Sequence, residues 1–159
     1  MPLRRVRRSL ERVTVPIGRV LPGGRGDPPT VSVYQLVGGE EAFRRLVHEF
    51  YGRVYADALL RPMFPDDRAG AEGRLTLFLI QYFGGPATYS EQRGHPRLRM
   101  RHLPFSIGAP ERDAWFGHML EAIDAVGIAE PARGQMRAYF DSSSSFMRNR
   151  EHDEGDGAV

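Results

Sequence analysis

The sequence of 159 residues predicts an all-α fold in one domain, on three observations. Apolar residues recur at the helical period of 3.6 in long stretches at about 40–55, 66–83 and 110–126. Glycine and proline groups separate these stretches, at Gly38-Gly39, at Gly84-Gly85-Pro86 and at Gly127. Strand-like alternation appears nowhere. The length favours a single domain with a sizeable core.

Composition excludes several classes of protein. The chain has no cysteine, so disulfides, thiolate metal sites and a cysteine nucleophile are excluded. No apolar run approaches the roughly 20 residues that span a bilayer, and no apolar stretch follows the N-terminal charges as in a secretory signal. We therefore expect a cytoplasmic protein without an integral membrane segment, and no nucleic acid as partner.

The two ends of the chain differ from the part between them. Residues 1–32 carry seven arginines against two acids, with many prolines and glycines, and we predict a disordered Arg/Pro/Gly-rich extension. The alternative is a basic amphipathic arm that touches membrane or nucleic acid, since Leu3, Val6 and Leu10 recur at helical spacing. Residues 151–159 predict an acidic disordered tail. The folded domain is then 33–150.

The first part of this domain predicts three helices. A short helix at 33–37 ends at the glycine pair, and the next runs to about residue 55. Its apolar stripe consists of Phe43, Leu46, Val47, Phe50, Tyr51 and Val54. Tyr51 lies on this stripe, so its hydroxyl points inward and needs a partner. The third helix lies within 66–83 and repeats Ala71, Leu75, Phe78, Leu79 and Tyr82.

The second part predicts a polar loop and two more helices. The loop is 87–97. Pro110 opens the next helix, whose buried face consists of Trp115, Phe116, Met119, Leu120, Ile123 and Val126. The last helix starts at Pro131 and turns inward Ala132, Met136, Tyr139, Phe140 and either Phe146 or Met147. Serines at 142–145 are poor helix formers, so we expect its last two turns to be frayed.

His102 is the candidate for a metal ligand. It ends a short segment that contains Arg93, Arg97, Arg99 and Arg101, just before Pro104. A neutral imidazole beside cations suits an iron macrocycle that carries two acidic propionates. The alternative is a surface histidine among solvated arginines, and the spacing alone leaves both open. His95 is a rival ligand, although it stands directly before Pro96.

The run GGPATYSEQRGHPRLRMRHLPF at 84–105, followed by ERDAW at 111–115, resembles the proximal region of the group II truncated haemoglobins, of the bacterial, actinobacterial type. The resemblance extends over about 33–146 and includes EFYGRVY at 49–55. It implies a two-on-two helical sandwich around one haem b, with His102 on the iron and Tyr51 and Trp115 as distal hydrogen-bond donors. The further haem contacts that it implies are Phe64, Ala71, Leu75, Phe78, Tyr89, His95, Leu98, Arg101, Phe105 and Met119.

Two positions depart from that family. Phe64 stands where many group II members carry tyrosine, and Ala71 where many haemoglobins carry a distal histidine or glutamine. Neither side chain donates a hydrogen bond, so the resemblance leaves Tyr51 and Trp115 to hold the ligand.

The resemblance implies a pentacoordinate haem protein that reversibly binds dioxygen and other diatomic gases. Two donors make oxygen release slow, which suits sensing or scavenging better than a carrier for delivery. The alternative is a haem enzyme for nitric-oxide dioxygenation or peroxide reduction, with an unidentified reductase as partner; a homodimer is compatible with either. If the resemblance is set aside, the chain is a helical binding module whose basic arm contacts nucleic acid or anionic lipid.

Overall fold

The computed structural model describes residues 30–150, and every regular element in this range is a helix. In chain order these are α1 (Val33–Leu36), α2 (Glu40–Tyr55), the 3-10 turn η1 (Arg61–Met63), α3 (Arg68–Tyr82), α4 (Thr88–Arg93), α5 (Leu98–His102), α6 (Ala109–Val126) and α7 (Ala132–Phe146). The all-α prediction is confirmed.

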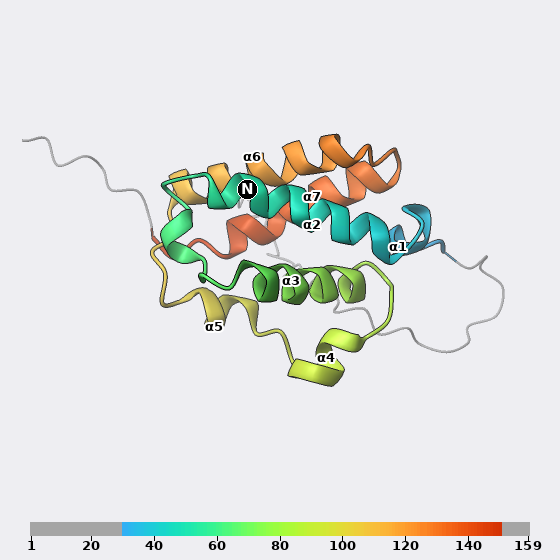
Figure 1. Ribbon diagram of the computed structural model, residues 1–159, viewed down its shortest axis with the longest axis horizontal. Coiled ribbons are helices and arrows are strands. Elements are labelled where there is room, and N and C mark those ends of the chain that lie inside the picture. Colours follow the sequence, from blue (N-terminus) through green and yellow to red (C-terminus); the bar gives the residue numbers. More distant parts are fainter. Residues whose placement is uncertain (1–29, 151–159) are drawn as a thin grey trace, which may run out of the picture.

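The four long helices pack as two pairs, α2 with α3 and α6 with α7. α2 packs against both α3 and α6, and α6 packs against α7 (Figure 1). α4 and α5 are short and lie on the side of α3 that faces away from α2 in this view. The fully buried side chains between the pairs include Phe43, Leu46, Phe50, Met119, Ile123, Met136 and Phe140. This arrangement is the expected two-on-two sandwich of helices.

Local side-chain chemistry sets where the helices begin. Ser32 caps α1, because its Oγ accepts from Gln35 N at 3.2 Å while Gln35 Oε1 accepts from Ser32 N at 3.1 Å. Asp67 caps α3 by accepting from Gly70 N at 3.0 Å. α6 ends at Gly127, whose φ of 72° is in the left-handed region that glycine adopts without strain.

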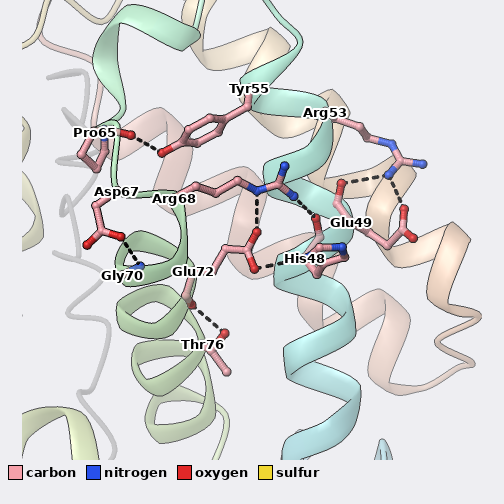
Figure 2. A network of polar contacts seen from close by, with 10 residues as sticks. All are labelled: His48, Glu49, Arg53, Tyr55, Pro65, Asp67, Arg68, Gly70, Glu72 and Thr76. Atoms are coloured by element: carbon pink, nitrogen blue, oxygen red, sulfur yellow. Dashed lines mark hydrogen bonds and ion pairs between the residues drawn. The ribbon is translucent and has the colours of Figure 1, made fainter.

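A polar network fastens α3 to α2 (Figure 2). Arg68 donates to Glu72 Oε1 at 2.6 Å and to the carbonyl of His48 at 3.3 Å, and the His48 ring contacts Glu72 Oε2 at 3.3 Å. The Tyr55 hydroxyl donates to the carbonyl of Pro65. These contacts fix the corner between the two helices and the position of Phe64, which lies within it.

The predicted loop at 87–97 is wrong over its first half, because α4 forms there. Tyr89 is only 5% exposed and packs edge-to-face on Phe78, with 5.6 Å between ring centroids. Gln81 donates to Ser90 Oγ at 2.7 Å and accepts from Ser90 N at 2.9 Å. This tertiary anchoring outweighs the polar composition, and α4 ends before Gly94, at φ 74°.

The expected fraying of the serine run is also wrong, since α7 continues to Phe146. Ser142 Oγ donates to the carbonyl of Ala138 at 3.0 Å, and Ser144 Oγ donates to that of Asp141 at 3.1 Å. These hydroxyls bond within the helix, and Ser144 is buried. Of the two residues predicted as candidates for the inward position, Phe146 is 57% exposed, whereas Met147 faces inward.

The predictions for the two ends fall outside the described range, apart from residues 30–32 within the extension. Within residues 30–150, none of the helices combines the length and the apolar character that crossing a membrane requires.

Candidate functional site

A cavity of about 310 Å³ lies among α2, α3, α5, α6 and α7. Its lining is mostly aromatic and aliphatic, with a few polar and charged groups, which is the usual composition of a small-molecule site. The sequence candidates that line it are Tyr51, Phe64, Ala71, Leu75, Phe78, Tyr89, Leu98, Arg101, His102, Phe105 and Trp115. Residues far apart in the chain thus meet at one cavity.

His102 lines this cavity, and one of its ring nitrogens contacts the backbone. It ends α5, and its Nδ1 lies 2.5 Å from the carbonyl oxygen of Leu98, one turn earlier. A carbonyl only accepts, so Nδ1 carries a proton, and in the neutral imidazole Nε2 then has the lone pair. A backbone carbonyl that orients a neutral imidazole in this way is common behind metal-bound histidines. His102 therefore has the tautomer and the half-buried position of a metal ligand.

Two hydrogen-bond donors lie on the cavity without a protein partner. Tyr51 is 6% exposed, and its ring packs at right angles to those of Phe50 and Phe64, at 5.5 and 5.7 Å. Trp115 packs edge-to-face on Phe50 and Phe140, at 5.1 and 5.8 Å. Within residues 30–150, neither the phenol nor the indole N–H makes a hydrogen bond. Both are fixed by packing and free to donate to a ligand.

The Tyr51 phenol stays protonated at ordinary pH. Burial is the main cause that raises the pKa of Tyr51 well above its ordinary value, and the neighbouring Tyr55 adds to it. Arg74 acts in the opposite direction on this pKa, and more weakly than burial. The hydroxyl is therefore a donor rather than a phenolate acceptor.

Two arginines contribute positive charge to the lining. Arg101 was a candidate, whereas Arg74 of α3 was missed, although it lies three residues after Ala71 and directly before Leu75. Neither makes an ion pair with another residue of the range 30–150. A guanidinium matches a carboxylate as a two-pronged donor, so both suit the acidic groups of a ligand.

A second group of lining residues was not found by sequence reasoning. It consists of Glu111, Arg112, Ser143, Ser144 and Met147, from the start of α6 and the end of α7. Arg112 pairs with Asp113 at 3.2 Å and with Asp141, and its buried Nε has no partner in the described chain. The one available signal was spacing, because Glu111 precedes Trp115 by four residues on α6.

Two sequence candidates lie away from the cavity. His95 is exposed, and its Nδ1 accepts from the backbone N of Arg97 at 3.0 Å. The chain turns there, with Arg97 in the left-handed region at φ 48°. Met119 is fully buried in the core between the helix pairs. Neither residue lines the cavity, whereas His102 does, and the haem contacts that the resemblance implies for His95 and Met119 stay predictions.

Known proteins match most of this chain. The family model described as bacterial-like globin matches residues 32–149. The group 2 truncated haemoglobin YjbI of Bacillus subtilis (strain 168) is 40% identical over 116 residues, which are 73% of this chain and 88% of that protein. Among solved structures, the haemoglobin of Chloroflexus aurantiacus is 55% identical with a TM-score of 0.74, and it covers 76% of this chain and 100% of its own. The truncated oxygen-avid haemoglobin from Bacillus subtilis is 39% identical with a TM-score of 0.72, at 75% and 100% coverage.

Proposed function

We propose that this protein binds dioxygen reversibly on haem b and releases it slowly. The premise is that the chain belongs to the bacterial-like globin family and is a haem protein for diatomic gases. The observation that carries this proposal is the composition of one cavity. There His102 can offer a lone pair in its neutral form, while Tyr51 and Trp115 offer two donors that have no hydrogen-bond partner among residues 30–150.

The residues of the cavity fit a haem. The mostly apolar lining suits the macrocycle, and the unpaired Arg74 and Arg101 suit its two carboxylates. Nε2 of His102 suits the iron. When bound, the haem would supply the iron to which a diatomic gas binds.

The protein's own residues then set how long the gas stays. Trp115 can only donate, and Tyr51 remains protonated because burial raises its pKa. Each hydrogen bond in such a dry site contributes about 1–3 kcal/mol, which corresponds to roughly tenfold to a hundredfold in dissociation rate. Phe64, Ala71 and Leu75 add no donor and keep water out. The similar truncated haemoglobin from Bacillus subtilis is oxygen-avid, which supports this proposal.

A second function is nitric-oxide dioxygenation or peroxide reduction in the same cavity, with electrons from a reductase. The surface at α5 favours it, because Met100 and Leu103 are 53% and 59% exposed beside the cavity-lining His102. Such exposed apolar groups among arginines suit contact with an acidic partner protein. The homodimer and the cytoplasmic location stay predictions from the sequence.

Spectroscopy and stopped-flow kinetics test the proposal. The purified protein, loaded with haem, should show a Soret band, a pyridine haemochrome spectrum of haem b and a reversible oxygen complex. Displacement of oxygen by carbon monoxide should be slow. Absence of the Soret band rejects the proposal, whereas rapid nitric-oxide or peroxide turnover with a reductase favours the second function.

A further inference from the structure

The chain that follows α7 returns to the loop between α5 and α6. The backbone N–H groups of Asn149 and Arg150 both donate to the carbonyl of Ile107, at 2.9 and 3.1 Å. We call Asn149 and Arg150 the C-terminal latch. It joins segments that lie more than forty residues apart in sequence, as the separation of 42 between Ile107 and Asn149 shows.

The carboxamide of Asn149 both accepts and donates hydrogen bonds to the backbone of this loop. Its Oδ1 accepts from Ile107 N at 2.8 Å. Its Nδ2 donates to the carbonyl of Phe105 at 2.7 Å and to that of His102 at 3.3 Å. One side chain thus fixes three backbone groups of the loop, and one of these groups belongs to the histidine that faces the cavity.

Arg150 extends the latch to the first turn of α6. It pairs with Glu111 at 2.9 Å, and Glu111 in turn accepts from Gly108 N at 3.1 Å. A Cβ at Gly108 would lie 2.9 Å from Nε of Arg150, so the guanidinium rests where any other residue would place a side chain. The latch therefore ties the loop to the helix that carries Trp115.

Apart from Ile107, which is 9% exposed, the segment at 98–107 buries no apolar side chain that would hold it in place. None of the residues of α5 is buried, and Leu103 is 59% exposed. The other backbone hydrogen bonds at 102–105 are local, from Leu103 N to Met100 and from Phe105 N to His102. A segment with few buried contacts has low local stability, so its few long-range hydrogen bonds decide its position.

We propose that Asn149 is a positioning residue for His102, and that through the carbonyls of His102 and Phe105 it sets the imidazole's approach to iron and the retention of haem. This inference rests on the proposed function, since it takes His102 as the iron ligand. Asn149 acts only through the loop and touches neither haem nor gas in this account.

Three variants of the haem-loaded protein test it. Asn149→Ala removes all three side-chain hydrogen bonds. Asn149→Asp keeps an oxygen that accepts from Ile107 N, but it replaces the donor Nδ2 by a second oxygen, which faces the carbonyls of His102 and Phe105 and cannot donate to them. The control is Arg148→Ala, because the adjacent Arg148 side chain makes no hydrogen bond in the described chain. The readouts are haem transfer to excess apomyoglobin and the iron–histidine stretching band in the ferrous, ligand-free state by resonance Raman.

We expect Asn149→Ala to lose haem about fivefold to thirtyfold faster than the parent, since two to three hydrogen bonds are lost in a site partly open to water. The iron–histidine band should shift or broaden, at least as much in Asn149→Asp, and stay in place in Arg148→Ala. A band and a haem-loss rate that are unchanged in both Asn149 variants overturn the proposal. A lower melting temperature with an unmoved band also overturns it, because that result shows a merely structural role.

Arg150→Gln covers the case that the Asn149 variants do not fold. It breaks the pair with Glu111, which holds the end of the latch on α6 and so holds Asn149 against the loop. We expect a smaller shift of the iron–histidine band in the same direction, and an unmoved band overturns the proposal that the latch positions His102. The parent protein separates the two levels of argument. A parent without a Soret band rejects the proposed function, whereas a normal parent with unaffected variants rejects the latch alone.

Discussion

The interface between α2 and α6 differs from the segment α5 in the kind of interaction that holds it in place. Phe43, Leu46 and Phe50 of α2 are fully buried, together with Met119 and Ile123 of α6. α5 buries none of its residues, and Met100 is 53% exposed. The donors Tyr51 and Trp115 thus stand on a close-packed base, whereas His102 stands on a segment held by polar contacts. On the proposed assignment of the site, its distal half rests on the core, and its proximal half depends on the C-terminal latch and on contact with haem.

Removal of haem should have the largest effect, and it should affect these two regions unequally. Haem that binds only the folded proximal segment stabilises it, so this segment loses its main apolar contact in the apoprotein. Amide hydrogen exchange should accelerate by orders of magnitude at 97–107, while amides in the middle of α2 and α6 keep most of their protection. Equal acceleration in both regions would show that the cavity wall and the core unfold as one unit.

His102→Ala should have the next largest effect. The variant loses the only imidazole that lines the cavity within the described chain, so stable haem uptake should fail unless free imidazole is added. The matched control is His95→Ala, since His95 lies outside the lining. Titration with haem, followed at the Soret band, measures both variants. Normal uptake and an unchanged ferrous spectrum in His102→Ala would reject this ligand.

The distal donors should differ from each other. Trp115→Phe should speed oxygen dissociation about tenfold to a hundredfold, and Tyr51→Phe by less, because the indole can only donate while the phenol can turn its proton elsewhere. Tyr55→Phe is the control, since that hydroxyl donates to Pro65. Stopped-flow displacement by carbon monoxide decides the order. An unchanged rate in Trp115→Phe contradicts the distal arrangement proposed here.

The core and the inward positions of Tyr51 and Trp115 could be predicted from sequence because they follow helical periodicity, whereas their role as distal donors is what the resemblance implies. Tyr51 lies on the apolar stripe of α2, and Trp115 on that of α6. The same periodicity places Met119, four residues after Trp115, on the buried face of α6, where it is fully buried. Spacing along a helix does not tell a core contact from a cavity contact, so it cannot decide the haem contact that the resemblance implies for Met119. Arg74 escaped notice because an arginine at the edge of an apolar stripe has the same pattern as a solvated one.

The proximal half could be predicted less well, for a different physical reason. Its geometry depends on pairing between Asn149 and Ile107, 42 residues apart, and no local pattern encodes such a contact. The formation of α4 likewise depends on the packing of Tyr89 against Phe78 of another helix. The resemblance implies His102 as the ligand, whereas the contacts of Asn149 with its loop are visible only in three dimensions.

Loss of Arg74 or of Arg101 should have a moderate effect on the rate of haem loss. Arg74→Ala and Arg101→Ala should each speed haem loss a few-fold, because each removes a partially solvated partner of a carboxylate. High salt should reduce the difference from the parent, since it screens such pairs. Arg45→Ala, at an exposed position of α2, is the control. A variant with parental haem loss at low salt would show that its arginine does not pair with the cofactor.

Deletion of residues 1–28 should have the smallest effect. These residues combine seven arginines with many prolines and glycines and complete no apolar face, so we expect them to add little to folding. The shortened protein retains Ser32, whose capping box begins α1, and all residues that line the cavity. Its Soret spectrum and oxygen dissociation rate should equal those of the full chain, and its melting temperature should fall within a few degrees. A large loss of stability or of haem would instead show that the arm packs on the globin domain. A change at α5 alone, seen by hydrogen exchange, would place that contact on the proximal half, where the domain has the least apolar burial of its own.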